Sequence, residues 1–325
     1  MHAVVLRSFG PAENFSYESV PDPEPGPGQV RVAVKAAGVH FVETVMRAGL
    51  GGPTSPPLPE LPTIFGGEVS GRVDAVGPDV DAAWLGADVV TSGGSPGGYA
   101  ELAVAEVTNL HRVPPGVSHE TAVAMIVTGC TTLQFLDTAE LTSSDIVLVT
   151  SAAGGIGRLI IQYARRLGAT VIGAAGGPAK VAAVRELGAD LAVDYDRPSW
   201  EREVRDWLGG DTVTALLDGV GGDKARAGFD LLAAGGRYLT IGGSSQQEFT
   251  PDPETLKERD LTVTNALLVL LGRPETRLEY EARALAAAAD GSLVPAVQSF
   301  PLAQTARAHA ALESRRTTGK VILVP

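Results

Sequence analysis

The most informative pattern of hydrophobic and polar positions lies near the middle of the chain. Ile146–Thr150 is an uninterrupted apolar, β-branched run of strand length, which predicts a strand buried on both faces. Residues 151–157 are small and glycine-rich. Arg158–Leu167 has helical spacing and stops at Gly168, a residue suited to a left-handed helix end. A second apolar run, Ala169–Ala175, completes a predicted strand–turn–helix–strand unit.

The glycine-rich turn of this unit predicts a dinucleotide-binding site. Its spacing is A-x-G-x-x-G, with Ala152 in place of the usual first glycine. Gly154 allows backbone to approach a pyrophosphate, Gly157 allows the helix to pack closely on the strand, and the helix N-terminus offers N–H groups to phosphate. The alternative is an ordinary tight turn, but the flanking elements supply the context that the motif requires. We expect the cofactor to contact Ala153, Gly154, Gly155, Ile156 and Gly157.

Helical and strand patterns continue to alternate after this unit. Helices are predicted at 179–187, 199–208 and 224–232, and strands at 190–194, 212–217, 236–241 and 261–265. This alternation predicts an α/β domain over residues 122–266 with a doubly wound parallel sheet, a Rossmann domain. Ligands bind beyond the carboxyl ends of such strands, so we expect the turns at Gly219-Val220 and Ile241-Gly242 to contact the cofactor. Plain turn chemistry is the alternative.

Residues 1–121 show a different, β-rich pattern. Short strands are predicted at 3–7, 29–35, 68–76, 88–91 and 99–104, separated by glycine and proline. Many short strands without helical crossovers predict a compact barrel-like domain. A helix at 118–139 leads into the nucleotide-binding domain. Residues 267–325 contain a helix near 275–290 and a final strand, Val321–Pro325, which we expect to complete the first domain.

Composition narrows the function classes. The formal net charge of -12 comes from interspersed acidic and basic residues, which disfavours nucleic acid and anionic membranes as partners. The single cysteine, Cys130, excludes an internal disulfide and any multi-thiolate zinc site. No signal peptide is visible, and the apolar stretch Leu261–Leu271 is too short to span a bilayer. We therefore expect a soluble cytoplasmic protein.

Five phrases together resemble the medium-chain dehydrogenase/reductase superfamily, in its zinc-independent quinone oxidoreductase (zeta-crystallin-like) branch. They are the glycine turn 152–157, Tyr99-Ala-Glu101, Leu187-Gly-Ala-Asp190, Asp194-Tyr195 and 312–320. The resemblance implies a GroES-like β domain built from both termini, a Rossmann domain between them, and an active-site cleft at their junction. It also implies a homodimer in which a late strand pairs across a two-fold axis, and Leu261–Leu271 is apolar enough for that edge.

The residues at the positions that bind metal and cofactor in this family differ from those of its zinc-dependent and NAD-preferring members. Zinc-dependent relatives carry Gly-His-Glu where this chain has Gly66-Gly67-Glu68, so we expect no metal. An NAD-preferring site usually has an acid about 20 residues beyond the glycines. This chain has no acidic residue between Asp145 and Glu186, which favours NADPH. Similar quinone reductases bind the 2′-phosphate through residues that match Lys180, Tyr195 and Arg315. Lys180 as a solvated helix-start lysine is the alternative.

The substrate side rests on fewer residues. Similar enzymes have an asparagine, an acid and a tyrosine where this chain has His40, Glu43 and Val45. His40 is a candidate proton donor to the reduced oxygen, since the ordinary pKa of histidine lies near neutrality, and Glu43 is a candidate to orient it. The alternatives are that His40 is a structural histidine with backbone partners and that Glu43 is a solvated charge. Thr131 matches a threonine near the nicotinamide, and Arg47 is interpreted as a surface or interdomain charge.

The leading hypothesis is an NADPH-dependent reductase that transfers a hydride to a quinone or a similar conjugated carbonyl, without zinc. An enone or alkenal double-bond reductase of the same fold is one alternative. A non-catalytic NADPH-binding protein is another, because the tyrosine position is occupied by Val45.

Overall fold

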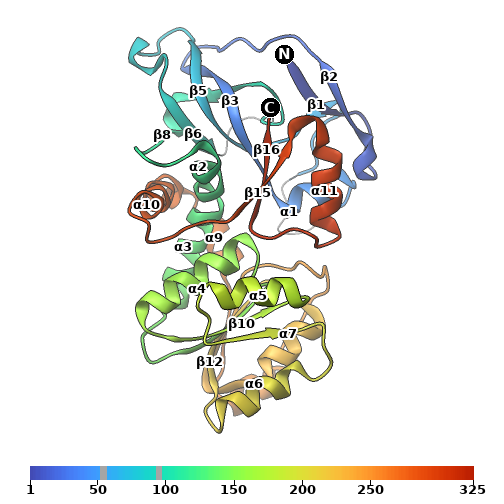
Figure 1. Cartoon of the computed structure of the whole chain (residues 1–325), viewed down its shortest axis with the longest axis vertical. Helices are drawn as coiled ribbons and strands as arrows, with labels where there is room; N and C mark the ends of the chain where they lie inside the picture. The colour runs from blue at the N-terminus through green and yellow to red at the C-terminus, as the bar shows by residue number, and fades with distance from the viewer. Residues whose placement is uncertain (52–56, 93–96) are drawn as a thin grey trace. The chain divides into compact units, whose positions relative to one another are not determined.

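The computed structural model describes residues 1–51, 57–92 and 97–325. The chain forms two compact units (Figure 1). Unit 1 comprises Met1–Cys130 and Leu278–Pro325, and unit 2 comprises Thr131–Arg277. The sequence placed the corresponding domain borders at 121 and 266.

Unit 2 contains a six-stranded, wholly parallel sheet in the order β11-β10-β9-β12-β13-β14. This order reverses direction at β9, which confirms the predicted doubly wound Rossmann sheet. The strands are β9 (Ile146–Thr150), β10 (Thr170–Ala175), β11 (Leu191–Asp194), β12 (Val213–Asp218), β13 (Leu232–Thr240) and β14 (Thr262–Asn265). The helices are α3 (Thr128–Ala139), α4 (Gly155–Leu167), α5 (Pro178–Glu186), α6 (Trp200–Leu208), α7 (Gly222–Phe229), α8 (Pro253–Glu258) and α9 (Ala266–Leu271).

Apolar packing explains why the central strand forms where the sequence predicts it. Val147, Leu148 and Val149 of β9 are completely buried, as a strand covered on both faces requires. The helix after it, α4, ends at Gly168, whose φ of 89° is the predicted left-handed conformation. At the far edge of the sheet, β14 ends at Asn265, whose side chain accepts a hydrogen bond from the Leu268 N–H at 3.1 Å and starts α9.

Unit 1 contains two sheets. A three-stranded sheet has the order β2-β1-β4, and a seven-stranded sheet has the order β15-β16-β3-β5-β6-β8, with β7 paired to β3. The strands are β1 (His2–Leu6), β2 (Phe15–Ser19), β3 (Gln29–Val39), β4 (Thr63–Ile64), β5 (Glu68–Val76), β6 (Asp88–Ser92), β7 (Leu102–Glu106), β8 (Leu110–Arg112), β15 (Val297–Pro301) and β16 (Lys320–Val324). The helices are α1 (Phe41–Arg47), α2 (His119–Ile126), α10 (Arg277–Ala289) and α11 (Thr305–Glu313), and short 3₁₀ turns occur at Ala12–Asn14, Ala82–Trp84, Val107–Asn109, Pro274–Thr276 and Leu302–Gln304.

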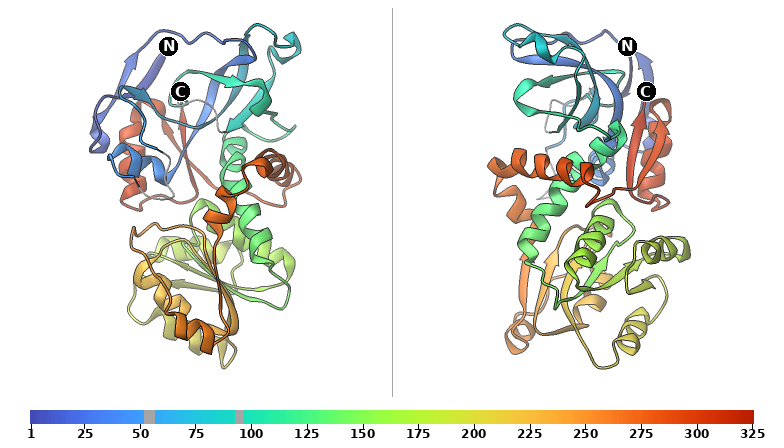
Figure 2. Two further views of the ribbon diagram at one scale, coloured as in Figure 1. Left: turned by 180° about the vertical axis from the view of Figure 1, so that it is seen from behind. Right: turned by 60° about the vertical axis from the view of Figure 1, so that its left-hand side comes forward.

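Strand β16 joins the two ends of the chain. It pairs with β3 in antiparallel register and with β15 in parallel, so a late segment occupies the interior of the sheet that the N-terminal segment starts. Figure 2 shows these red C-terminal elements beside the blue N-terminal strands. The predicted closing strand therefore completes this β-rich unit, the GroES-like part of the fold.

Several boundary predictions were wrong. The helix predicted over 224–232 ends at Phe229, and β13 begins at Leu232 rather than at 236. The apolar stretch Leu261–Leu271 is a strand only over Thr262–Asn265, and its second half forms α9.

The helix predicted over 118–139 is interrupted at Val127, which separates α2 from α3. Gly129 follows the break, and a Cβ there would lie 3.0 Å from the Cβ of Ala284, so glycine permits close contact with α10. Strand β7 begins at Leu102 rather than at Tyr99. By length and composition His119–Ala139 could cross a membrane, but 72% of its most apolar window is buried within the protein, as in a core helix.

Candidate functional site

The turn after β9 leads to one position, residue 157, where only glycine fits. Gly154 is the N-cap residue of α4, and Ser151 starts the turn in a left-handed conformation with φ 53°. A Cβ on Gly157 would lie 2.5 Å from the Ser151 carbonyl oxygen and 2.8 Å from the Cα of Ala152. Ala153 is buried in the same turn. The helix thus packs directly on the turn backbone, and any larger residue at 157 would displace it.

The first turn of α4 presents the N–H groups of Gly155, Ile156 and Gly157. These groups precede the first intrahelical bond, which the Arg158 N–H donates to the Gly154 carbonyl at 3.0 Å. No acidic side chain occupies this turn. Burial lowers the pKa of Arg158, and its buried Nε has no hydrogen-bond partner among the described residues. Unpaired amides at a helix N-terminus form a site for phosphate.

Asp218, at the end of β12, organises the neighbouring turn. Its carboxylate accepts hydrogen bonds from the Thr150 hydroxyl at 2.5 Å and from the N–H groups of Val220 and Gly221 at 3.1 and 2.9 Å. Burial raises the pKa of Asp218 although these donors oppose the rise. The Gly219 N–H donates to Thr150 in turn, at 3.0 Å. The sequence analysis missed Asp218, and its signal is an acid at the end of an otherwise apolar strand.

The turn after β13 is fixed to the same loop. The Ile241 N–H donates to the Asp218 carbonyl at 2.8 Å, and the Ser244 N–H donates to the Gly219 carbonyl at 3.2 Å. A Cβ on Gly242 would lie 3.4 Å from that Gly219 carbonyl oxygen, so these two turns are in van der Waals contact. The predicted cofactor residues on both strands therefore lie together at the carboxyl edge of the sheet.

Lys180 and Tyr195 occupy the part of this edge beyond β10. Lys180 is the third residue of α5 and is half-buried, and Pro178 starts that helix. Tyr195 follows β11, is buried, and lies under the Nζ of Lys224 at 5.1 Å from the ring centroid. The Lys224 ammonium also donates to the Tyr195 carbonyl.

Two carboxylates that the sequence did not place here also reach the end of β10. Asp194 accepts hydrogen bonds from the N–H groups of Gly177 and Asp196 at 2.9 and 3.1 Å. A Cβ on Gly176 would lie 2.5 Å from Oδ2 of Asp196, so that carboxylate touches the Gly176 backbone. Lys224 lies 3.4 Å from Oδ1 of the same residue.

These features of unit 2 fit a dinucleotide cofactor. Glycine occupies three of the four positions 154–157, and no acidic side chain lies in the first turn of α4, so the N–H groups there suit a phosphate. Lys180 and the buried Tyr195 lie near the end of β10.

In unit 1, three side chains from distant parts of the sequence meet. His40 follows β3, Glu68 starts β5 and Lys320 starts β16, and the pairing of Val39 with Val321 and of Ala37 with Val69 brings these strand ends together. The His40 Nε2 lies 3.0 Å from Glu68 Oε1 and 3.3 Å from the Lys320 Nζ, and Lys320 also pairs with Glu68. We call these three residues the His40 cluster.

Burial and charge define the chemistry of the His40 cluster. Glu68 is fully buried and Lys320 is 94% buried, whereas 24% of the His40 side chain is exposed. Burial alone would raise the pKa of Glu68, but the charges of His40 and Lys320 hold it at about 2. Gly38 makes room for the carboxylate, because a Cβ there would lie 1.8 Å from Glu68 Oε1. A permanent carboxylate thus faces a partly exposed imidazole.

Glu43 belongs to a second network and not to the His40 ring. Its carboxylate accepts hydrogen bonds from the backbone N–H of His40 at 2.7 Å and from the Tyr99 hydroxyl at 2.8 Å. His309 Nε2 lies 3.2 Å from the same hydroxyl. The interpretation of Arg47 as a surface or interdomain charge was wrong, since it is 1% exposed, donates to the Gly10 carbonyl and pairs with Glu313.

The remaining predicted site residues lie on separate elements. Thr131 is the fourth residue of α3 and is half-buried. Arg315 is exposed between α11 and β16, with a left-handed φ of 56°. Thr131 belongs to unit 2, and Arg315 and His40 belong to unit 1.

The His40 cluster does not fit a zinc ion. It offers two possible ligands, His40 and Glu68, and the ammonium of Lys320, which has no lone pair, already contacts the carboxylate. Across residues 1–51, 57–92 and 97–325, no group of three or more His, Cys, Asp and Glu is placed to hold a metal.

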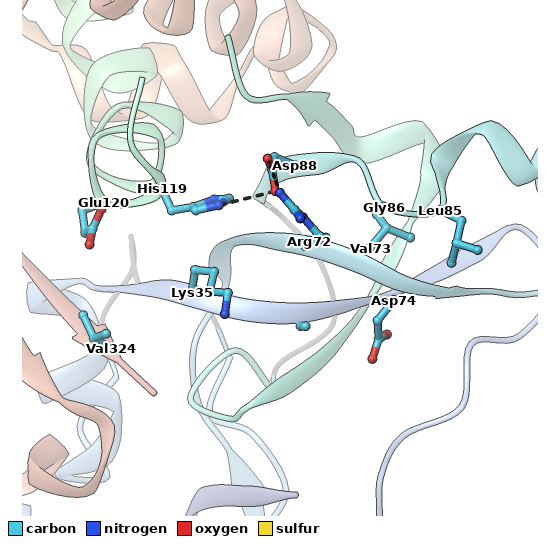
Figure 3. Close-up of a pocket in the computed structure, with 11 residues that line it drawn as sticks. Lys35, Arg72, Val73, Asp74, Leu85, Gly86, Asp88, His119, Glu120 and Val324 are labelled. Carbon is cyan, nitrogen blue, oxygen red and sulfur yellow. Dashed lines mark hydrogen bonds and ion pairs between the residues drawn. The ribbon is translucent and has the colours of Figure 1, made fainter. Parts of the chain in front are cut away.

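A pocket of about 850 Å³ lies elsewhere on unit 1 (Figure 3). Arg72 and His119 point toward Asp88 in it, with the Arg72 Nε 2.9 Å and the His119 Nε2 3.6 Å from Asp88 Oδ1. None of the predicted site residues lines this pocket. Arg72, Asp88 and His119 are paired with one another in this pocket, and the predicted cofactor and substrate residues lie elsewhere.

Comparisons with known proteins agree with this geometry. Residues 26–115 match the family described as alcohol dehydrogenase GroES-like domain, and residues 187–323 match the family described as zinc-binding dehydrogenase. The second description names a metal that the described residues do not fit. The chain is 33% identical to a quinone oxidoreductase of Pseudomonas aeruginosa over 99% of both chains, and 31% identical to a 2-haloacrylate reductase of a Burkholderia species over 100% and 99%.

Solved structures give the same result. The Escherichia coli quinone oxidoreductase complexed with NADPH matches with a TM-score of 0.87 at 27% identity, covering 100% of both chains. A mycobacterial protein complexed with NADPH has a TM-score of 0.87 at 33% identity with the same coverage. An NAD-dependent alcohol dehydrogenase matches with a TM-score of 0.84 at 33% identity, covering 100% of both chains. By fold, sequence and motif, the chain belongs to the medium-chain dehydrogenase/reductase superfamily, in its quinone oxidoreductase branch.

Proposed function

We propose that this protein is an NADPH-dependent reductase that adds hydrogen to a quinone or a similar conjugated carbonyl compound without zinc. The observation that carries the proposal is the His40 cluster, which holds a partly exposed imidazole against a buried carboxylate. Such a pair can deliver a proton to an oxygen that becomes negative during reduction. A chain that protonates the product by a side chain does not need a metal to stabilise that oxygen.

The residues of unit 2 hold the cofactor. Bound NADPH supplies the hydride, which is the two-electron part of the reduction. The N–H groups of Gly155, Ile156 and Gly157 bind its phosphates, and the turns at 219–220 and 241–242 line the carboxyl edge of the sheet. Lys180 supplies a positive charge for the 2′-phosphate.

The His40 cluster supplies the proton. Glu68 is anionic at neutral pH, because the charges of His40 and Lys320 hold its pKa at about 2. The His40 ring contacts both that carboxylate and the Lys320 ammonium. Both ring nitrogens of His40 lie 3.3 Å from the Lys320 Nζ, and the side chain is 24% exposed, so His40 can pass a proton to the substrate and take a new one from water. Hydride and proton together add two hydrogen atoms to the substrate.

Reduction of an activated carbon–carbon double bond is the second candidate. The similar 2-haloacrylate reductase is named for a conjugated alkene, and its identity to this chain is comparable to that of the quinone oxidoreductases. An alkene reductase must protonate carbon or an enolate oxygen, which requires a proton donor more than quinone reduction does.

A substrate panel tests the proposal. NADPH consumption would be followed with quinones, enones and 2-haloacrylates, each before and after exhaustive chelation. We expect turnover of at least one conjugated class at a rate that chelation leaves unchanged. No turnover across the panel, or activity restored only by added zinc, would refute it.

We further propose that the protein is a homodimer joined along β14. Among the described strands β14 pairs only with β13, which leaves one edge open, and Val263 on it is 40% exposed. Light scattering should give twice the chain mass, and Val263→Lys should give a monomer while Leu85→Lys, at an exposed site of unit 1, should not. A monomer mass for the parent protein at micromolar concentration would contradict the dimer.

A further inference from the structure

In dinucleotide-binding sheets an acid about 20 residues beyond the glycines binds the ribose 2′-hydroxyl, and its absence admits a 2′-phosphate. Here β10 ends at Ala175 and is followed by Gly176 and Gly177, so the chain itself provides no acid at that point. Read from the sequence alone, the position is open to phosphate.

The structure supplies acids to this position from the neighbouring strand. The Asp194 carboxylate already accepts hydrogen bonds from the N–H groups of Gly177 and Asp196. The Oδ2 atom of Asp196 lies 2.5 Å from the place that a Cβ on Gly176 would occupy. The Asp196 carboxylate therefore stands at the point from which an NAD-type acid acts, and 62% of its side chain is exposed and able to reach a ligand.

Lys224 restrains that carboxylate. It reaches from α7 to within 3.4 Å of Asp196 Oδ1, donates to the Tyr195 carbonyl and lies 5.1 Å from the Tyr195 ring centroid. These three contacts hold its ammonium between the two residues, with 31% of its side chain exposed. The charge of Asp196 is thereby compensated on the side facing away from Gly176.

We propose that Lys224 is a specificity-determining residue, which keeps the site selective for NADPH by neutralising Asp196. Without Lys224, Asp196 is an uncompensated acid that repels a 2′-phosphate and accepts hydrogen bonds from a 2′,3′-diol. Lys224 acts through Asp196 and is thus a positioning residue. This inference rests on the proposed cofactor and adds the residues that select it.

Cofactor binding without turnover provides the test. Dissociation constants for NADPH and NADH would be measured by fluorescence titration for the parent protein, Lys224→Met, Asp196→Asn and the double variant. Methionine retains an aliphatic chain over Tyr195 and removes the charge. Lys257→Met and Asp206→Asn, at exposed positions of unit 2, are matched controls.

Lys224→Met should reduce the preference for NADPH over NADH by roughly tenfold, a moderate effect because the pair is partly screened by solvent. Asp196→Asn should raise the preference, and Lys224→Met should have little further effect in the Asp196→Asn background. Lys224→Arg should retain the parental preference. The two control variants should leave it unchanged.

Two outcomes would overturn the inference. If Lys224→Met leaves the preference unchanged while the parent protein prefers NADPH, Lys224 has no part in selection and the proposed cofactor stands. If the loss is equally large with Asp196→Asn present, Lys224 contacts the phosphate itself. A parent protein that binds both cofactors equally would instead refute the proposed cofactor.

Discussion

The His40 cluster of unit 1 and the edge of unit 2 that we propose binds the cofactor are built in different ways. The edge is made mainly of backbone: glycine turns, the first N–H groups of α4 and loops fixed by Asp218. The His40 cluster is made of three ionisable side chains, two buried and one partly exposed, from strand ends far apart in the sequence.

This difference separates binding from chemistry. Backbone N–H groups cannot titrate, so the edge should bind a phosphate in the same way over a wide pH range. The His40 cluster depends on charge states, and a single neutral side chain changes it. Substitutions in unit 1 should therefore affect rate, and substitutions on the unit 2 edge should affect cofactor affinity.

Replacement of His40 should give the largest effect. We expect His40→Ala to lower the maximal rate with an enone by about 10²–10⁴-fold, the usual contribution of general acid catalysis, while NADPH affinity remains unchanged. Quinones should be less affected, because the hydroquinone anion is comparatively stable. His40→Asn, the residue type of similar quinone reductases, should retain more quinone activity. His2→Ala, at an exposed histidine, is the control. Parental rates in both His40 variants would make His40 structural.

The second largest expected effect is a loss of folding stability at acidic pH, caused by His309. Burial, aided by Arg47, lowers the pKa of His309 to about 3, and its buried Nδ1 has no partner among the described residues. The unfolded chain binds this proton below its ordinary pKa of about 6.5, whereas the folded protein does so only below about 3, so stability is lost as pH falls through that window. The loss should be about 2 kcal/mol at pH 5.

Urea unfolding at pH 7 and pH 5 measures this loss. His309→Gln should have a smaller difference between the two pH values than the parent protein, and His2→Gln should not. Glu68 does not interfere, because its pKa of about 2 places its own loss of stability below about pH 4.5. An equal pH difference in His309→Gln would show that other groups cause the acid sensitivity.

The third effect is on affinity. Lys180→Ala should weaken NADPH binding roughly 5- to 150-fold, the range of a single hydrogen bond to a charged group, and should change NADH binding little. Fluorescence titration of both cofactors measures it, with Lys257→Ala as the matched control. Equal affinities of the parent protein for both cofactors would remove the basis for this assignment.

Removal of metal ions should have no effect on the protein. Exhaustive chelation should leave rate, cofactor affinity and melting temperature unchanged, because Lys320 supplies positive charge beside Glu68. Elemental analysis should find no stoichiometric zinc. Loss of activity on chelation, recovered with zinc, would mean that the protein holds a functional zinc ion and would contradict the proposal.

Local patterns in the sequence predicted most of unit 2. The apolar run 146–150, the turn 151–157 and Gly168 each form as expected, because strand, turn and helix end depend on adjacent residues. The split at Val127 was missed. It lies beside the close approach of Gly129 to Ala284, which are distant in sequence.

The His40 cluster could not be derived in this way. Candidate His40 was identified from its position in a family phrase, but its partner was taken to be Glu43, three residues away, whereas the structure places Glu68 and Lys320 on the ring. Strand register determines those contacts, and a single sequence does not specify register over 280 residues. Asp196 beside Gly176 was missed for the same reason.

The interior position of β16 has a consequence for the order of events during synthesis. Its partner residues in β3 end at Val39, and β16 begins at Lys320, 281 residues later. At about 5–20 residues per second, the ribosome needs roughly 15–55 s to deliver it. Unit 2 ends at Arg277, 43 residues before β16 begins, so all of unit 2 is synthesised while Ala37–Val39 still has an open edge and Glu68 still lacks its ammonium. Chains stalled just before residue 320 should therefore show a protease-resistant unit 2 and a cleavable β3. Resistance at both would mean that unit 1 folds without its last strand.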